Sequence, residues 1–325
     1  MNIFKTKDIN MALAGAKRIA IAGHIRPDGD CIGSCMAMYK YLMLKKDDYG
    51  IDIIDVYLEP ISKSFGIIDG VDEINHTYNA DVSYDVFISL DCASLDRLGN
   101  AIVYYRTAKM TINIDHHISN TEFAGVNHIV TNASSTCEVI FDLFYEDRIT
   151  QAIAECVYVG IVHDTGVFKH SNTTGKTLIT VARLLDKGIR ASKLIDETYN
   201  QKTFMQNQLL GRCLMESQLA LNGKVIISAV DREVLDFYHA QSHDTEGVID
   251  QLRITKGVEV AIFIYEYEED VHKISLRSNG DVNVSSVATY FDGGGHIKAA
   301  GCSMHGRVDD IVNRLVLMIE EQLKF

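Results

Sequence analysis

The sequence predicts an α/β protein with a mostly parallel sheet in an N-terminal domain, a helical linker, and a smaller α+β domain. Strands alternate with helices over the first half of the chain, and most of these strands are apolar on both faces. The order of elements changes after residue 218, and 325 residues exceed what one hydrophobic core usually supports. We therefore expect domains at 1–188 and 219–325, joined by a linker at 189–218.

The N-terminal elements follow from hydrophobic periodicity. Short apolar runs bounded by turn residues predict buried strands, and longer periodic runs predict helices. The expected strands are 18–23, 51–58, 86–90 and 111–114. The expected helices are 6–16, 30–46, 139–145, 152–162 and 176–185. Strands buried on both faces are typical of a parallel sheet that is covered by helices.

The linker and the C-terminal domain have different patterns. The linker is polar and has no proline, so we expect a semi-rigid helical connection with breaks at Gly188 and Gly211. Beyond it, the expected strands are 224–230, 258–266 and 272–277, and the expected helices are 283–291 and 308–323. The acidic run 266–270 predicts the exposed tip of a hairpin between the last two of these strands.

The charge of the chain limits its partners. The formal net charge is -13 and the sequence pI is about 5.3. Binding to duplex nucleic acid needs a basic surface, so this class of partner is not expected. A short anionic substrate remains compatible with the charge, because bound dications and a few local cations can reverse the field in a cleft.

Cysteine usage and hydropathy indicate a cytoplasmic protein without a membrane partner. The 7 cysteines are scattered, odd in number, and form no Cys-x-x-Cys pair. This pattern fits reduced thiols better than disulfides or a zinc site. No apolar run approaches the roughly 20 residues that are needed to span a bilayer.

The stretch 21–33, IAGHIRPDGDCIG, carries the first candidate metal ligands. His24, Asp28 and Asp30 crowd one turn between a strand and a helix, and Pro27 restricts the backbone there. Closely spaced carboxylates repel one another unless a cation lies between them. The stretch therefore predicts a site for a divalent cation.

Three further segments are rich in Asp and His: 90–99 (LDCASLDRLG), 112–120 (INIDHHISN) and 160–173 (GIVHDTGVFKHSNT). Each alone is also explained as a helix cap or a polar loop, but their joint occurrence favours a metal site. His24, Asp91 and the run 115–117 follow predicted strands, whose carboxyl ends share one edge of a parallel sheet. Mixed carboxylate and imidazole donors suit Mn²⁺ better than Mg²⁺.

These motifs resemble those of the DHH/DHHA1 phosphoesterases, and in particular the NrnA-like oligoribonuclease and pAp-phosphatase type. The resemblance lies in HIRPDGD, the LD at 90–91, DHH at 115–117, HDTG at 163–166 and GGGHIKAAG at 293–301. It covers nearly the whole chain, in the family's order. The resemblance implies a parallel-sheet DHH domain that binds metal and a DHHA1 domain that binds substrate.

The resemblance also implies roles for particular residues. One cation is expected on His24, Asp28 and Asp91, and the second on Asp30, Asp91, His116 and Asp164, with Asp91 as the bridge. His117 is expected beside the reacting phosphoryl group, with Asp115 orienting a neighbouring histidine, and Arg97 and Asn172 at the edge of the site. The expected cofactors are two Mn²⁺, with Mg²⁺ or Co²⁺ as substitutes. Two such cations acidify water and neutralise phosphoryl oxygens, so no Ser or Cys nucleophile is needed.

The glycine run 293–295 is the candidate substrate grip. Glycine lets backbone N–H groups approach a phosphate, and a helix expected at 297–300 would favour the anion at its N-terminus. We expect the part of the substrate that is not cleaved to contact Arg277, Ser278, Gly294, Gly295 and His296. The alternative is a plain glycine turn.

The leading hypothesis is a Mn²⁺-dependent phosphodiesterase, an exonuclease that degrades short RNA or DNA oligonucleotides to mononucleotides in a cleft between the domains. The same site could remove the terminal phosphate of pAp. A linear or cyclic dinucleotide phosphodiesterase is the close alternative, and an inorganic pyrophosphatase is less favoured. A non-catalytic nucleotide-binding module is the alternative from another class. The resemblance is compatible with a homodimer.

Overall fold

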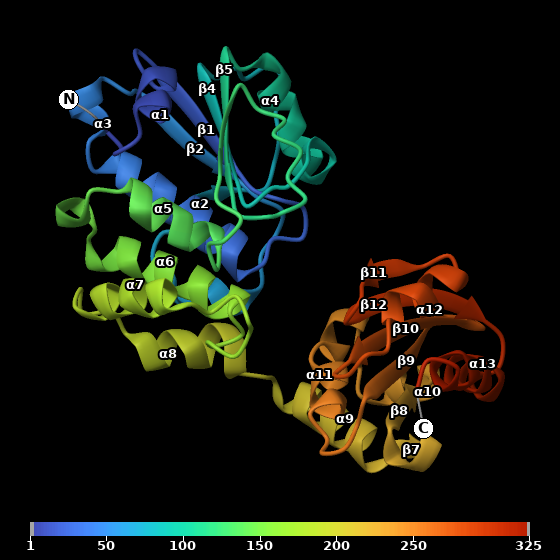
Figure 1. The fold of residues 1–325 in the computed structure, drawn as a ribbon. Helices are drawn as coiled ribbons and strands as arrows, with labels where there is room; N and C mark the ends of the chain where they lie inside the picture. Colours follow the sequence, from blue (N-terminus) through green and yellow to red (C-terminus); the bar gives the residue numbers. More distant parts are fainter. Residues whose placement is uncertain (1–2, 324–325) are drawn as a thin grey trace. The chain divides into compact units, whose positions relative to one another are not determined.

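The computed structural model describes residues 3–323, and the chain divides into two compact units between Gln201 and Lys202. Each unit has its own sheet (Figure 1). The predicted α/β class, with a parallel N-terminal sheet, is confirmed. The finer division into 1–188, 189–218 and 219–325 stays a prediction.

The N-terminal unit is built on six parallel strands in the order β3-β2-β1-β4-β5-β6. Their bounds are β1 Arg18–Ala22, β2 Ile53–Tyr57, β3 Ile74–Asn75, β4 Val86–Leu90, β5 Met110–Asp115 and β6 Val126–Ile129. The chain moves outward from β1 in one direction to β3 and then returns to place β4 on the other side of β1. The order of strands therefore reverses between β1 and β4, and ligands bind at such switch points in open α/β sheets.

Both faces of this sheet are buried. Ile19 and Ile21 of β1 belong to the larger core, while Ala20 and Ala22 face a second cluster rich in tyrosine. This alternation follows from the two-residue period of a strand. Figure 1 shows α2, α5 and α6 on one side of the sheet and α4 on the other.

The helices of this unit are α1 Lys7–Ala12, α2 Gly29–Met43, α3 Lys46–Tyr49, α4 Ile102–Thr107, α5 Thr136–Leu143, α6 Gln151–Asp164, α7 Gly175–Leu185 and α8 Ala191–Ile195. Short 3₁₀ helices occupy η1 Lys63–Ile67, η2 Val71–Glu73, η3 Leu95–Ala101 and η4 Glu146–Arg148. Helix α2 packs closely on α6, because glycine at position 33 lets the α6 backbone approach. A Cβ on Gly33 would lie 2.5 Å from the carbonyl oxygen of Cys156.

The predicted linker is largely helical. After α8 come a π-helical turn, η5 Asp196–Asn200, and α9 Phe204–Met215. The predicted break at Gly188 is confirmed, since this residue has a φ of 76° between α7 and α8. The predicted break at Gly211 is wrong: α9 continues through it, because one glycine inside a helix costs only about 1 kcal/mol.

The C-terminal unit has a mixed sheet in the order β11-β12-β10-β9-β8-β7, in which only the pair β8–β9 is parallel among the described strands. Its strands are β7 Gln218–Ala220, β8 Val225–Val230, β9 Val260–Glu268, β10 Val271–Ser278, β11 Gly294–His296 and β12 Ala299–His305. Its helices beyond α9 are α10 Arg232–Phe237, α11 Val248–Arg253, α12 Val284–Tyr290 and α13 Val308–Glu320, with 3₁₀ turns η6 Leu221–Gly223 and η7 Ser242–Thr245. Residues of α12 and α13 cover one face of this sheet, and residues of α9, α10 and α11 cover the other.

The helix expected at 297–300 is wrong. Residues 294–305 form the antiparallel hairpin β11–β12, which leaves two residues, Ile297 and Lys298, in its loop. The glycines serve this close pairing, because a Cβ on Gly295 would lie 2.5 Å from the carbonyl oxygen of Ala299. The expected anion site at a helix N-terminus therefore does not exist at this place.

The described residues contain seven free cysteines, all buried. Across 3–323, no helix combines the length and the hydropathy that a membrane crossing requires.

Candidate metal centre

The candidate ligands lie at the carboxyl ends of three neighbouring strands. His24 comes two residues after β1, Asp91 directly follows β4, and Asp115 is the last residue of β5. Asp91 has a φ of 55°, a left-handed conformation that is uncommon without glycine. Strain of this kind occurs where a side chain must be aimed for function. The structure thus brings together at the switch point the segments that the sequence placed there.

A first donor group consists of His24, Asp28 and Asp91. The Nε2 atom of His24 lies 3.4 Å from Asp91 Oδ2 and 3.6 Å from Asp28 Oδ1. Asp28 is the N-cap of α2, and its Oδ1 accepts hydrogen bonds from the N–H groups of Asp30 and Cys31, both at 3.1 Å. The capping bond fixes this carboxylate at the start of the helix.

A second donor group consists of Asp30, His116 and Asp164. His116 Nε2 lies 3.0 Å from Asp164 Oδ2 and 3.7 Å from Asp91 Oδ1. This nitrogen is buried and has no well-formed hydrogen bond to any described residue. A buried polar atom without such a partner is rare in native proteins and indicates a missing ion or water. Asp91 lies between the two donor groups: its Oδ2 faces His24 of the first group, and its Oδ1 faces His116 of the second.

A third group of possible donors, Asp91, Asp115, His116 and His117, overlaps with both of these groups. Within it, His117 is oriented by Asp115, a carboxylate that is in neither the first nor the second group. Its Nδ1 donates to Asp115 Oδ1 at 2.8 Å, and Asn120 Nδ2 donates to Asp115 Oδ2 at 2.6 Å. Asp115 is fully buried, whereas the His117 side chain is 42% exposed. Because Nδ1 carries the proton in this bond, Nε2 of the neutral ring is an acceptor and that of the protonated ring is a donor.

Thr136 and Cys137 are members of the site that the sequence analysis missed. Asp30 Oδ2 accepts from the Thr136 N–H at 2.6 Å, and Asp30 Oδ1 accepts from the Cys137 N–H at 2.9 Å. These are the first N–H groups of α5, so the helix end stabilises a buried carboxylate. The run Ser134–Thr136 is typical of the start of a helix, but this pattern does not predict that the helix start contacts Asp30.

The electrostatics of the cluster favour added positive charge. Burial acts to lower the pKa of His24, but Asp28 and Asp91 outweigh it and raise the pKa to about 12. Burial opposes protonation of His116 too, yet Asp164 and Asp30 raise its pKa to about 10. Burial raises the pKa of Asp30 well above its usual range, and the neighbouring carboxylates act in the same direction. Carboxylates that cannot all ionise together are stabilised by a cation among them.

The donor set fits divalent cations. The donor atoms within each group lie within 4.8 Å of one another, and the groups combine imidazole nitrogen with carboxylate oxygen. This combination suits a borderline first-row dication. Together the two groups contain the six residues that were predicted as metal ligands, and Asp91, predicted in both sets, belongs to the first group and lies 3.7 Å from His116 of the second. Their roles as ligands stay a prediction.

The predicted edge residues lie beside these segments. The carbonyl oxygen of Arg97 accepts from the Ile25 N–H at 2.8 Å, which holds the η3 loop next to the His24 turn. Asn172 Nδ2 donates to the carbonyl oxygens of Ser134 and Asp164 at 2.9 and 3.1 Å. Asn172 thus joins the Asp164 turn to the loop that leads into α5.

The predicted substrate residues belong to the C-terminal sheet. Arg277 and His296 both lie opposite Ala299 in the register of three adjacent strands, so their side chains share a face. Gly294, Gly295 and His296 are exposed on the edge strand β11. Ser278 is buried, and its hydroxyl donates to the carbonyl oxygen of Gly280 at 3.2 Å.

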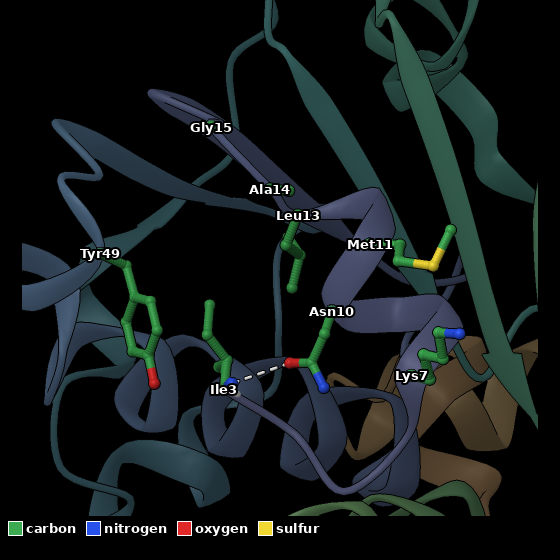
Figure 2. Close-up of a pocket in the computed structure, with 8 residues that line it drawn as sticks. All are labelled: Ile3, Lys7, Asn10, Met11, Leu13, Ala14, Gly15 and Tyr49. Atoms are coloured by element: carbon green, nitrogen blue, oxygen red, sulfur yellow. Dashed lines mark hydrogen bonds between the residues drawn. The ribbon is translucent and has the colours of Figure 1, made fainter. Parts of the chain in front are cut away.

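A cavity of about 380 Å³ lies next to α1 in the N-terminal unit (Figure 2). It is lined by Ile3, Lys7, Asn10, Met11, Leu13, Ala14, Gly15 and Tyr49. The Asn10 side chain already accepts from Ile3 and Phe4 and donates to Phe4 and Thr6. Its amide therefore holds the local chain together, and none of the predicted site residues lines this cavity.

Comparison with protein families assigns both units. The DHH family N-terminal domain matches residues 18–161, and the DHHA1 domain matches residues 222–324. A parallel sheet with this cluster at its switch point, followed by such a mixed sheet, defines a two-domain phosphoesterase. The chain belongs to the DHH/DHHA1 family.

Relatives of similar length are found among curated and solved proteins. The chain is 28% identical over 310 residues to the bifunctional oligoribonuclease and PAP phosphatase NrnA of Thermus thermophilus, covering 94% of this chain and 90% of that protein. It is 27% identical over 292 residues to the Bacillus subtilis protein of the same name, covering 88% and 89%. The crystal structure of an exopolyphosphatase-related protein from Bacteroides fragilis matches with a TM-score of 0.86 and 25% identity, covering 97% and 95%.

Proposed function

We propose that this protein is a Mn²⁺-dependent phosphodiesterase that degrades short oligonucleotides and dinucleotides to mononucleotides. The observation that carries the proposal is the pair of donor groups at the switch point of the sheet, with Asp91 in one group and 3.7 Å from His116 of the other. Two neighbouring cations clamp a phosphoryl group in many hydrolases. The substrate class is supported by the two NrnA relatives, whose names describe an oligoribonuclease and PAP phosphatase.

The donor groups define which residues would hold the cations. His24, Asp28 and Asp91 would hold one, and Asp30, His116 and Asp164 would hold the second together with Asp91. When bound, two such cations lower the pKa of water and neutralise phosphoryl oxygens. Imidazole in both groups favours Mn²⁺ over Mg²⁺, and Co²⁺ fits the same donors.

His117 is the proposed catalytic residue outside the donor groups. The hydrogen bond to Asp115 is the main cause that raises the pKa of His117, so the protonated ring is favoured. A protonated Nε2 would donate to a non-bridging phosphoryl oxygen as negative charge grows there. Asp115 keeps the ring in the orientation that this bond requires.

The C-terminal unit is proposed to bind the part of the nucleotide that is not cleaved. His296 and Arg277 share one face of the sheet and suit a phosphate or a ribose. Arg277 Nε also lies 3.6 Å from Asp250 Oδ1, a half-exposed carboxylate that lies at the same distance from Arg253 Nε. A grip of this kind favours short substrates and would also accept pAp, from which the same site would remove a terminal phosphate.

Two alternatives stay open. A phosphodiesterase specific for linear or cyclic dinucleotides would use the same donor groups and differ only in substrate shape. A non-catalytic nucleotide-binding module is disfavoured, because it has no need for two adjacent donor groups of carboxylate and imidazole.

The seven free, buried cysteines are compatible with a reducing compartment.

The test is turnover of a labelled dinucleotide with Mn²⁺, in parallel with pAp, cyclic di-AMP, oligonucleotides of 2–5 residues and pyrophosphate. Release of mononucleotide that stops on addition of EDTA supports the proposal. Turnover that resists EDTA, or binding without turnover, contradicts it. Preference for one cyclic or linear dinucleotide over the longer oligonucleotides selects the alternative enzyme.

A further inference from the structure

Thr136, at the start of α5, contacts three of the buried carboxylates around the two donor groups. Its hydroxyl lies 2.9 Å from Asp91 Oδ1 and 3.4 Å from Asp115 Oδ1. Its backbone N–H donates to Asp30 Oδ2 at 2.6 Å. Thr136 and all three carboxylates are buried, so water does not compete for these hydrogen bonds.

The hydroxyl proton of Thr136 goes to Asp91. A threonine hydroxyl has one proton, so it donates to one carboxylate at a time. Asp115 Oδ1 already accepts from the His116 N–H and from His117 Nδ1, each at 2.8 Å. The shorter contact of Thr136 is the one to Asp91, whose carboxylate contacts only histidines among the other described side chains.

This bond fixes the orientation of the carboxylate that stands between the donor groups. Asp91 Oδ2 faces His24 Nε2 at 3.4 Å, while Asp91 Oδ1 faces His116 Nε2 at 3.7 Å. Rotation of the carboxylate would remove one oxygen from each group. A hydrogen bond from Thr136 uses one lone pair of Oδ1 and leaves the second lone pair for a ligand.

We infer that Thr136 is the positioning residue that holds Asp91 as the bridge between the two cation sites. It acts through Asp91 with its hydroxyl and through Asp30 with its backbone, and it binds neither cation nor substrate. The inference rests on the paired cation sites of the proposed function. It adds that the orientation of Asp91 between them depends on Thr136, a residue outside both donor groups.

Two substitutions separate the hydroxyl from the rest of Thr136. Thr136→Val removes the hydroxyl, keeps the branched shape, and leaves the backbone bond to Asp30. Thr136→Ser keeps the hydroxyl and removes the methyl group. The matched control is Thr177→Val, because Thr177 is buried in the same unit and its hydroxyl donates to the buried Glu138 at 3.0 Å, outside both donor groups.

The experiment measures Mn²⁺ affinity by calorimetric titration and stability by urea unfolding of the same full-length proteins. Loss of a residue that orients a metal ligand weakens affinity by about 10–100-fold, and this is the expected result for Thr136→Val. Thr136→Ser should keep an Mn²⁺ affinity close to that of the wild type, because serine retains the hydroxyl that donates to Asp91. Thr177→Val should lose stability to an extent similar to Thr136→Val and keep the Mn²⁺ affinity of the wild type.

Other outcomes overturn the inference. These are an unchanged Mn²⁺ affinity in Thr136→Val, an equal loss in Thr177→Val, or a wild type that binds no divalent cation. If Thr136→Val does not fold, Thr136→Ala replaces it with the same expectation. A wild type that binds Mn²⁺ but leaves the labelled dinucleotide intact would refute the proposed phosphodiesterase and leave the role of Thr136 standing.

Discussion

Gly160 of α6 lies directly against the carboxylate of Asp30. A Cβ on Gly160 would stand 2.5 Å from Asp30 Oδ1 and 2.2 Å from Cys137 Sγ. Asp30 and Cys137 are fully buried, so neither can move into solvent. Because glycine has no side chain, position 160 leaves the space in which Asp30 accepts hydrogen bonds from the N–H groups of α5.

Gly160→Ala should displace Asp30 and weaken the second cation site. Overpacking of this kind costs about 1–3 kcal/mol, and the higher helix propensity of alanine offsets only about 1 kcal/mol of that. We expect a lower urea midpoint and a weaker Mn²⁺ affinity. Gly175→Ala is the control, because nothing lies within 4 Å of a Cβ at Gly175. Wild-type Mn²⁺ binding by Gly160→Ala would show that Asp30 needs no such space.

Asp91→Ala should remove ligands from both donor groups at once. Paired cations supply several kcal/mol of transition-state stabilisation, so we expect turnover to fall by about 10³-fold or more. Metal analysis of the purified variant should show loss from both sites, since Asp91 contacts His24 in one group and His116 in the other. A variant that keeps near-normal rates would exclude Asp91 as a bridge.

Mn²⁺ should raise the thermal stability of the N-terminal unit. A cation at 100 times its Kd stabilises the folded state by about 2.7 kcal/mol, or roughly 5–10 °C in Tm for a unit of this size. Asp164→Asn should reduce this increase, because Asp164 belongs to the second donor group, and Asp142→Asn should not. EDTA should reverse the increase. The same increase in Asp164→Asn would remove Asp164 from the ligand set.

The sequence was sufficient to place His24, Asp91 and the run 115–117 in one site. The reason is geometric: parallel strands end at a common edge, so residues that follow different strands meet without any knowledge of loop structure. Asp30 could be added because it is the second residue of the helix that starts at the same loop. The segment 160–173 was selected by its Asp and His content, but only the family resemblance identified Asp164 in it as a ligand, because Asp164 ends α6 and not a strand.

Thr136 and the β11–β12 hairpin could not be predicted in the same way. The contact of Thr136 with Asp30 depends on how α5 packs against α2, and these residues are 106 positions apart. The helix expected at 297–300 failed because small residues after a glycine run also suit a tight hairpin. Residue Ala299 pairs with Arg277 of β10, and this long-range contact favours a strand over a helix for the segment.

His296→Ala should weaken substrate binding and leave the cations in place. Loss of one hydrogen bond to a charged group costs about 1.5–3 kcal/mol, which corresponds to a rise in KM of roughly 10–100-fold. His305→Ala is the matched control, since His305 is exposed on β12 of the same unit. We expect an unchanged KM for the control and an unchanged Mn²⁺ content for both variants. Loss of Mn²⁺ in His296→Ala would instead make His296 a metal ligand.

The ion pair between Arg190 and Glu155 should make the free energy of unfolding of the N-terminal unit decrease at acidic pH. The nearly buried Glu155 carboxylate accepts from Arg190 Nε at 2.9 Å and Nη2 at 2.7 Å, and this pairing holds the pKa of Glu155 below its ordinary value. Since the folded pKa is lowered, the stabilisation is complete above the unfolded pKa and is lost as pH falls through the folded pKa. Arg190 is partly exposed, so we expect Glu155→Gln to cost about 1–2 kcal/mol near pH 7.

The difference between wild type and Glu155→Gln should narrow as pH falls below the ordinary value of 4.5, because the wild-type carboxyl group then takes up the proton that the amide already mimics. Urea unfolding at several pH values measures this difference directly. Asp72→Asn, an exposed carboxylate of the same unit, should change the free energy of unfolding by less than about 0.5 kcal/mol at every pH. A difference for Glu155→Gln that stays constant down to about pH 3 would mean that the pair stabilises the unit by its shape and not by its charge.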